Sequence, residues 1–170
     1  MIEDAFSETL TAEEEEALTP EELAAILGDD DEVLVSHDEL DSLYVGNIDT
    51  LSNGKCETSL VTNSNMIADS ERLVHNGFIG SAGEYAAVAA VNEPLGVVYS
   101  QNTTYFAPVR VGDEVKFTAT ARHLEGRKRE VDVVGHIGDI KVYESRITIL
   151  VHEYHPLKIK LMDVAGLDDQ

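Results

Sequence analysis

The 170-residue chain has few basic residues: 12 Lys and Arg stand against 33 Asp and Glu, which gives a net charge of −21. Binding to a nucleic-acid backbone requires clustered Lys and Arg, so this balance argues against it. The single cysteine, Cys56, permits neither an internal disulfide nor a Cys-based zinc site, and fits a reducing, cytoplasmic setting. No apolar run approaches the roughly 20 residues of a membrane span, so no membrane partner is expected. The first residues, MIEDAFSETL, lack the basic and apolar regions of a signal peptide.

The acidic charge is concentrated at the start of the chain. Residues 1–54 hold 17 Asp and Glu and no base, whereas the remainder holds 16 acids and 12 bases. Within the first part, Thr19-Pro20 and the apolar stripe that ends at Gly28 predict one short helix in an otherwise solvated segment. This leader is either a solubilising tail or a docking arm. We therefore expect three parts: an acidic leader (1–41), a folded domain (42–162) and a C-terminal tail (163–170).

The folded domain combines one long helix with many short strands. A helix is expected over residues 73–92, where apolar and small residues dominate. Alternating side chains predict the strands, which we place at about 43–48, 58–61, 96–106, 114–123, 129–140, 143–152 and 157–161. Because strands follow one another without intervening helices, the pattern indicates an α+β fold with an antiparallel sheet.

Glu84 is the only formally charged residue of the helix expected at 73–92. Surface helices normally carry a charged face, so this helix is expected to be surrounded by protein. Gly80 and Gly83 lower helix stability and therefore indicate close packing or ligand approach. Burial raises the pKa of a carboxylate, and such groups are enriched at functional sites. Glu84 is thus either a structural hydrogen-bond acceptor or a general base or nucleophile.

The residues His75-Asn76-Gly77 stand where this helix begins. Asn76 is the expected N-cap. The free N–H groups of the first turn, near Gly77 and Phe78, carry partial positive charge and can polarise a carbonyl oxygen as an oxyanion hole does. His75 beside a helix cap is by itself more typical of a structural hydrogen bond than of catalysis.

These features resemble the hotdog fold of acyl-CoA thioesterases. That family carries His-Gly-Gly and an Asp or Glu nine positions after the His, as Glu84 follows His75 here, although Asn76 replaces the first Gly. A strand end, a Pro and a Gly-Asp turn follow in the family and are matched by residues 105–113. The resemblance covers about residues 43–161. It implies a single hotdog domain, in which an antiparallel sheet of five or six strands wraps around one long central helix, with an acidic N-terminal extension.

A smaller hotdog subgroup is a closer match. It includes a flagellum-co-regulated acyl-CoA-binding protein and the effector domain of the fatty-acid synthesis repressor. The shared pattern is His75-x-x-Phe78-Ile79, then Phe106-x-Pro108, then residues 128–136. Members of this subgroup are regarded as ligand binders, and an Asn often replaces the acid that this chain keeps as Glu84.

The resemblance leaves three functions open. The first is an acyl-CoA or acyl-carrier-protein thioesterase, with Glu84 as the general base or nucleophile and with His75, Asn76, Gly77 and Phe78 completing the site. The second is a non-catalytic acyl-CoA sensor, and the third is a structural dimer that no longer binds CoA. A CoA thioester is expected as substrate or ligand, with no cofactor required. The resemblance also implies a homodimer or a dimer of dimers, with the acyl pocket at the interface.

Two further groups of residues are candidate ligand contacts. Arg127-Lys128-Arg129 is the densest basic cluster and suits the phosphates of CoA, or it is a solvated turn that balances neighbouring acids. Asn102, Thr103 and Thr104 supply donors near the thioester, or they are ordinary polar strand residues. The remaining histidines have no helical partner spacing and no carboxylate set, so no metal site is expected.

Overall fold

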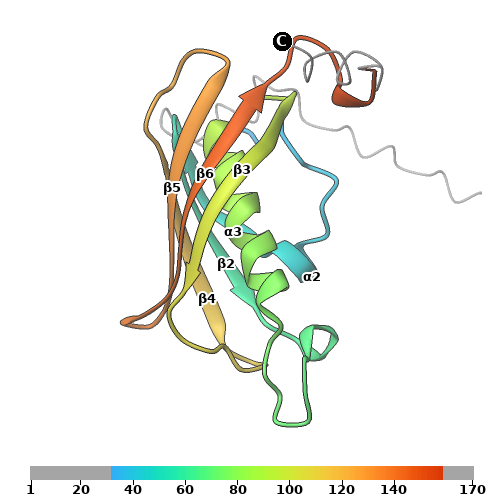
Figure 1. The fold of residues 1–170 in the computed structure, drawn as a ribbon, viewed down its shortest axis with the longest axis vertical. Helices are drawn as coiled ribbons and strands as arrows, with labels where there is room; N and C mark the ends of the chain where they lie inside the picture. Colours follow the sequence, from blue (N-terminus) through green and yellow to red (C-terminus); the bar gives the residue numbers. More distant parts are fainter. Residues whose placement is uncertain (1–31, 159–170) are drawn as a thin grey trace, which may run out of the picture.

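Six antiparallel strands form a single sheet in the computed structural model, which describes residues 32–158 (Figure 1). The order across the sheet is β1-β2-β4-β5-β6-β3, so β3 lies at the edge opposite to β1. The strands are β1 (Asn47–Ser52), β2 (Lys55–Val61), β3 (Gly96–Tyr105), β4 (Glu114–Ala121), β5 (Lys128–Ile137) and β6 (Ile140–Val151). The α+β hotdog fold expected from the sequence is therefore confirmed, with six strands.

The sheet curves around one long helix, α3 (Asn76–Val91) (Figure 1). Its inner face is apolar by alternation: in β4, Val115, Phe117 and Ala119 are buried, whereas the side chains between them are exposed. Small side chains fill most of α3, and a Cβ on Gly83 would lie 2.5 Å from Cζ of Tyr143. The sheet thus packs closely against the helix at its glycines. Close packing is what the sequence predicts, because glycine in a helix interior lowers helix stability and needs such a compensation.

The helix is shorter than the range expected at 73–92. Leu73 and Val74 are extended, and they form isolated bridges with Arg110 and Ile67. The chain turns into the helix at His75, and α3 ends at Asn92, whose left-handed φ of 50° is a common helix terminator. Asn76 is therefore the first helical residue, and the expectation that it is the N-cap is wrong: His75 holds that position without a side-chain cap.

Most predicted strands differ from the structure by one to three residues at an end, and two differ more strongly. The strand expected at 43–48 is β1, which begins only at Asn47, because Ser42–Val45 forms the short helix α2. The side chain of Asp41 accepts a hydrogen bond from the Leu43 N–H, and Gly46, with a φ of 88°, ends the turn. In place of the strand expected at 157–161, Pro156–Lys158 forms the 3₁₀ turn η2, and residues 159–161 lie outside the described residues. A second 3₁₀ turn, η1, spans Ser64–Met66.

Residues 32–41, called here the strap, connect directly to the folded domain. The side chain of Asn92 holds the strap in two places, since its Nδ2 donates to the Val33 carbonyl at 2.9 Å and its Oδ1 accepts from the Val35 N–H at 2.8 Å. The Glu32 N–H donates to the Leu51 carbonyl in β1 at 3.0 Å. The end of the predicted leader is thus bound to the sheet and to the end of α3. The helix expected at 19–28 and the tail at 163–170 lie outside the described residues.

Candidate functional site

Glu84 lies near the middle of α3 and is its only formally charged side chain. The sequence predicts a buried acid, but in the single chain the carboxylate is half-buried because protein covers the outer face of α3 only in part. Removal of water by the surrounding protein raises the pKa of Glu84 above its ordinary value of 4.5, and the charge of His37 opposes that rise. Glu84 therefore holds its proton more tightly than an exposed carboxylate does.

His37 belongs to the strap and was not among the predicted site residues. Ser36 is buried, and its hydroxyl lies 3.0 Å from Nδ1 of His37. His37 also adopts a left-handed φ of 56°, which is uncommon for a residue other than glycine. The strap thus contributes to the electrostatic environment of Glu84. No sequence signal indicates this role, because His37 lies in a segment whose acidic composition is typical of a solvated leader.

The start of α3 brings His75 and Gly77 together. A Cβ on Gly77 would lie 3.0 Å from Cδ2 and 3.1 Å from Nε2 of His75, so the imidazole covers the glycine. The Phe78 N–H donates to the His75 carbonyl at 3.1 Å, which removes it from the predicted oxyanion hole. Within the described part of the chain, no backbone acceptor is recorded for the N–H groups of Asn76 and Gly77. These two N–H groups are the ones available to polarise a ligand.

The two sequence landmarks of the hotdog resemblance meet in one cleft. A cleft of about 400 Å³ lies beside the start of α3, and His75 and Asn76 form one side of it. Tyr105 and Phe106 at the end of β3 form another side, and Phe106 is 53% exposed. The remaining lining residues are Ala68, Leu73, Val74, Ala107 and Pro108. Most of this lining is apolar, which suits an organic group better than a free ion.

The three candidate residues of β3 face in two directions. Asn102 and Thr104 line a groove of about 600 Å³ on the outer face of the sheet, away from α3. Thr103 points to the inner face, where its Oγ1 lies 2.8 Å from the Ser145 hydroxyl. The structure therefore separates the three residues, and only Thr103 lies on the same side of the sheet as Glu84.

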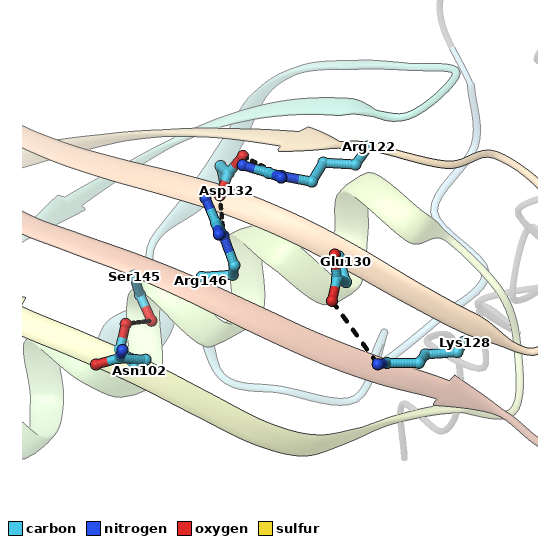
Figure 2. A network of polar contacts seen from close by, with 7 residues as sticks. All are labelled: Asn102, Arg122, Lys128, Glu130, Asp132, Ser145 and Arg146. Atoms are coloured by element: carbon cyan, nitrogen blue, oxygen red, sulfur yellow. Dashed lines mark hydrogen bonds and ion pairs between the residues drawn. The ribbon is translucent and has the colours of Figure 1, made fainter.

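Ion pairs occupy the outer face of the sheet beside this groove. Figure 2 shows Asp132 between two arginines, with Arg122 Nε at 2.6 Å and Arg146 Nε at 3.0 Å from its oxygens. The hydrogen bonds from both arginines outweigh partial burial, and the pKa of Asp132 is lowered. Arg122 and Arg146 are therefore already paired with a carboxylate and are less available to an anionic ligand.

The basic cluster is also divided by the structure. Arg129 is 7% exposed and donates to the carbonyls of Gly126 and Leu124 and to Glu93 Oε1, at 2.6, 2.5 and 3.0 Å. Arg129, in β5, therefore holds the β4–β5 loop, and these hydrogen bonds occupy the guanidinium that was predicted to bind phosphate. Lys128 is exposed with Glu130 3.8 Å away, and Arg127 lines a shallow cleft with His152. For these two residues a phosphate contact stays a prediction.

Other reactive groups of the described residues are few. Burial, with smaller contributions from Asp49 and Glu57, raises the pKa of the Cys56 thiol to about 12, which keeps it protonated and poorly nucleophilic. Between residues 32 and 158 no three His, Cys, Asp or Glu side chains are grouped as metal ligands. In the same range no helix has the length and apolar character needed to cross a membrane.

Comparisons with known proteins agree with this arrangement. The profile of the Thioesterase superfamily matches residues 72–144. A sigma28-regulated virulence protein from Campylobacter jejuni is 32% identical, with a TM-score of 0.72, over 74% of this chain and 89% of its own. An uncharacterized protein from Pyrococcus horikoshii is 31% identical, with a TM-score of 0.73, over 75% of this chain and 98% of its own. The chain belongs to the thioesterase superfamily.

Two further proteins are similar to this thioesterase-superfamily chain, one over part of its sequence and one in its fold. A methylthioribose-1-phosphate isomerase from Aquifex aeolicus is 40% identical over 95 residues, which is 56% of this chain. The chain spans only 21% of the length of that curated relative. A protein from Streptococcus mutans, solved with bound acetyl-CoA, is 13% identical over 69% of this chain and 97% of its own, with a TM-score of 0.61, and shares the fold.

The superfamily match covers the part of the chain that contains the candidate residues of α3 and β3. It begins just before His75 and ends in β6, so it contains α3 with Glu84 and the cleft residues of β3. The strap with His37 lies outside it. The residues matched to the superfamily therefore supply the carboxylate, while the strap adds a covering element whose His37 changes the local charge.

Proposed function

We propose that this chain binds an acyl thioester of CoA or of acyl-carrier protein and hydrolyses it, with Glu84 as the general base. The observation that carries the proposal is the position of Glu84: a desolvated carboxylate, alone on an otherwise uncharged helix, in a member of the thioesterase superfamily. A carboxylate with a raised pKa is a better base near neutral pH than an exposed one.

The reaction needs only groups that the chain supplies and water. The Glu84 carboxylate takes a proton from a water molecule, whose oxygen attacks the thioester carbonyl. A helix N–H group such as that of Gly77 stabilises the negative charge that develops on the carbonyl oxygen. The carbon–sulfur bond then breaks, and the thiolate leaves with the proton, giving a carboxylic acid and a free thiol. Direct attack by Glu84 on the carbonyl, through an acyl-enzyme anhydride that water hydrolyses, gives the same products.

One chain does not hold both catalytic groups close enough to act on one carbonyl. Gly77 and Glu84 lie two helical turns apart on one face of α3, which is about 10 Å along the helix at 1.5 Å per residue. Two antiparallel copies of α3 that cross near Ser81 would place Glu84 of one copy beside Gly77 of the other. Ser81 is small and exposed, so the crossing is sterically open at that position. The proposal therefore includes a homodimer.

Two elements of the structure support binding of a CoA-type ligand. The mostly apolar cleft beside His75 accepts an organic group, and Lys128 and Arg127 extend from the β4–β5 hairpin, where each is exposed. A pyrophosphate or 3′-phosphate forms charge-assisted hydrogen bonds with such side chains. Arg129 is excluded from this role by its internal hydrogen bonds.

Release of free thiol from short, medium and aryl acyl-CoAs tests the proposal. Removal of a general base lowers kcat by about 10²–10⁴-fold, so we expect a decrease in kcat of this size for Glu84→Gln. Glu114→Gln is the matched control, because Glu114 is an exposed carboxylate on β4. Activity that survives Glu84→Gln unchanged would remove Glu84 from the mechanism, and equal losses in the two variants would indicate a general effect on the fold.

A non-catalytic acyl-CoA sensor is the second candidate, and one observation favours it. The Phe78 N–H is already bonded to the His75 carbonyl, so the oxyanion hole has fewer free donors than the sequence predicts. In that case acyl-CoA would raise the melting temperature of the wild type without release of thiol. Glu84→Gln would then retain ligand binding, because a sensor does not need a base.

A further inference from the structure

Four hydroxyl-bearing side chains form a compact group on the inner face of the sheet. Thr103 and Tyr105 come from β3, and Ser145 and Tyr143 come from β6. The strands pair so that Thr103 lies directly opposite Ser145 and Tyr105 directly opposite Tyr143. Alternate residues of a strand share a face, so all four side chains point to the same side. This group is called here the hydroxyl quartet.

The quartet contains one hydroxyl, that of Tyr143, that forms no hydrogen bond of normal geometry in the described chain, although the Ser145 and Thr103 hydroxyls lie near it. Thr103 Oγ1 and Ser145 Oγ are 2.8 Å apart, and Ser145 Oγ also donates to the Asn102 carbonyl at 3.2 Å. Tyr143 is 0% exposed, its ring packs 5.7 Å from that of Tyr105, and its Oη has no hydrogen-bond partner among residues 32–158. Phenylalanine would fill nearly the same volume without an unpaired hydroxyl, so the hydroxyl lowers stability unless a group from outside pairs with it.

The helix above the quartet has room for these hydroxyls. A Cβ on Gly80 would lie 2.6 Å from Oη of Tyr105, and a Cβ on Gly83 would lie 2.6 Å from Oη of Tyr143. Glycine weakens a helix interior, so α3 gives up stability at the two positions where the hydroxyls reach it. Gly83 directly precedes Glu84. Burial raises the pKa of Tyr143, the neighbouring Ser145 and Thr103 hydroxyls lower it, and the charges of Tyr105 and Glu84 raise it to a smaller extent.

The quartet is also connected to the cleft. Tyr105 lines the cleft that contains His75 and Asn76, and it is 38% exposed. Thr103 is partly exposed along the edge strand β3. Tyr105 thus lies between the cleft and Tyr143, whose buried ring packs against it. The rest of the cleft lining is largely apolar, so Tyr105 supplies the hydroxyl group of that lining.

We infer that the hydroxyl quartet selects acyl groups that carry a hydroxyl or oxo oxygen on the first carbons beyond the thioester carbonyl. The inference rests on the proposed function, because the thioester carbonyl must lie beside Glu84 for the substituent to reach Tyr143. An oxygen at carbon 2 or 3 of the acyl group accepts the free Tyr143 hydroxyl hydrogen. A plain acyl chain leaves that hydroxyl unpaired, and sites with buried polar groups discriminate against ligands that cannot pair them.

Two substrates of equal length test the inference: butanoyl-CoA and 3-hydroxybutanoyl-CoA, with each enantiomer measured separately. One additional hydrogen bond corresponds to a preference of about tenfold, so we expect kcat/KM for one hydroxy enantiomer to exceed that for the plain ester by about tenfold. Tyr143→Phe removes only the hydroxyl and is expected to bring the ratio to about one. Its melting temperature should equal or exceed that of the wild type, because the unpaired hydroxyl is gone.

Tyr85→Phe is the matched control, because Tyr85 lies on α3 outside the quartet, and it should leave the ratio unchanged. Equal kcat/KM for the plain and hydroxy esters in the wild type would overturn the inference and leave the proposed function intact. So would an unchanged ratio in Tyr143→Phe. If no ester is hydrolysed, the ratio of dissociation constants replaces kcat/KM, and a preference lost in Tyr143→Phe supports the inference. Absence of both turnover and binding for every ester would refute the proposed function and the inference together.

Discussion

Ionisation of Glu84 is unfavourable in the folded protein, because burial raises its pKa. A carboxyl group with a raised pKa binds protons more strongly in the folded state than in the unfolded state. Its protonation therefore favours the folded state, fully at a pH below the unfolded pKa near 4.5, and this contribution to the free energy of unfolding is lost as the pH rises through the folded pKa. Glutamine is neutral at every pH. We therefore expect Glu84→Gln to gain stability over the wild type as the pH rises from about 5 to about 8.

Urea denaturation at several pH values measures this gain as a shift in the unfolding midpoint. Glu114→Gln, at an exposed position, should show no pH-dependent gain. A midpoint for Glu84→Gln that stays below that of the wild type at about pH 8 would mean that the ionised carboxylate stabilises the fold instead.

Arg129 and Arg127 lie two positions apart and have opposite surroundings. Arg129 makes three hydrogen bonds through its fork of N–H groups, whereas Arg127 is exposed. Lysine has one ammonium and cannot reproduce that geometry. We expect Arg129→Lys to lower the free energy of unfolding by about 1–3 kcal/mol and Arg127→Lys to change it by less than about 0.5 kcal/mol. Equal effects in denaturant melts would contradict the structural role of Arg129.

At the residue scale, the sequence predicted the identity of the acid but not its surroundings. Glu84 was recognisable because no other charged residue occurs on its helix. His37, whose charge lowers the pKa of Glu84, was not recognisable, because contacts between the strap and α3 depend on tertiary packing. The same applies to Arg129, since alternation and charge do not reveal which of three adjacent bases is buried.

At the scale of elements, the contact between α3 and the sheet determines which helix residues are tolerated. Alanine at position 83 would improve helix propensity by about 1 kcal/mol, but its Cβ would lie 2.5 Å from the Tyr143 ring. Overpacking of this kind costs about 1–3 kcal/mol, so we expect a net loss for Gly83→Ala. In a Tyr143→Leu background the ring is absent, and the same substitution should cost less or stabilise. Thermal and urea melts of the four proteins give the coupling, and no coupling would refute the contact.

Strand boundaries were largely predictable, because alternation and glycine turns are local signals. The sequence missed α2, since Leu43-Tyr44-Val45 has strong strand propensity, and the Asp41 cap and Gly46 prevailed over that preference. The start of α3 was placed three residues early, because Leu73 and Val74 are as apolar as the helix. These residues pair with other segments instead, and such long-range bridges leave no periodic signal in the sequence.

For the whole molecule, the proposed site requires two copies. We expect light scattering to give a mass of about twice 18.6 kDa, the mass of one chain. Ser81→Arg adds a long charged side chain where two α3 helices would cross, and should give monomers that have lost activity. Thr118→Arg, on the outer face of the sheet, is the control and should remain dimeric. A fully active monomer would contradict the shared site.

The central claim is that ionised Glu84 acts as the base in thioester hydrolysis, and the pH dependence of kcat/KM for the wild type tests it most directly. Burial raises the Glu84 pKa above 4.5, so the rate should rise with pH through an apparent pKa above that value and then level off. The small residual rate of Glu84→Gln should lack this rise. A wild-type rate that is constant from about pH 5 to about pH 8, or that falls as the pH rises over this range, would contradict the claim.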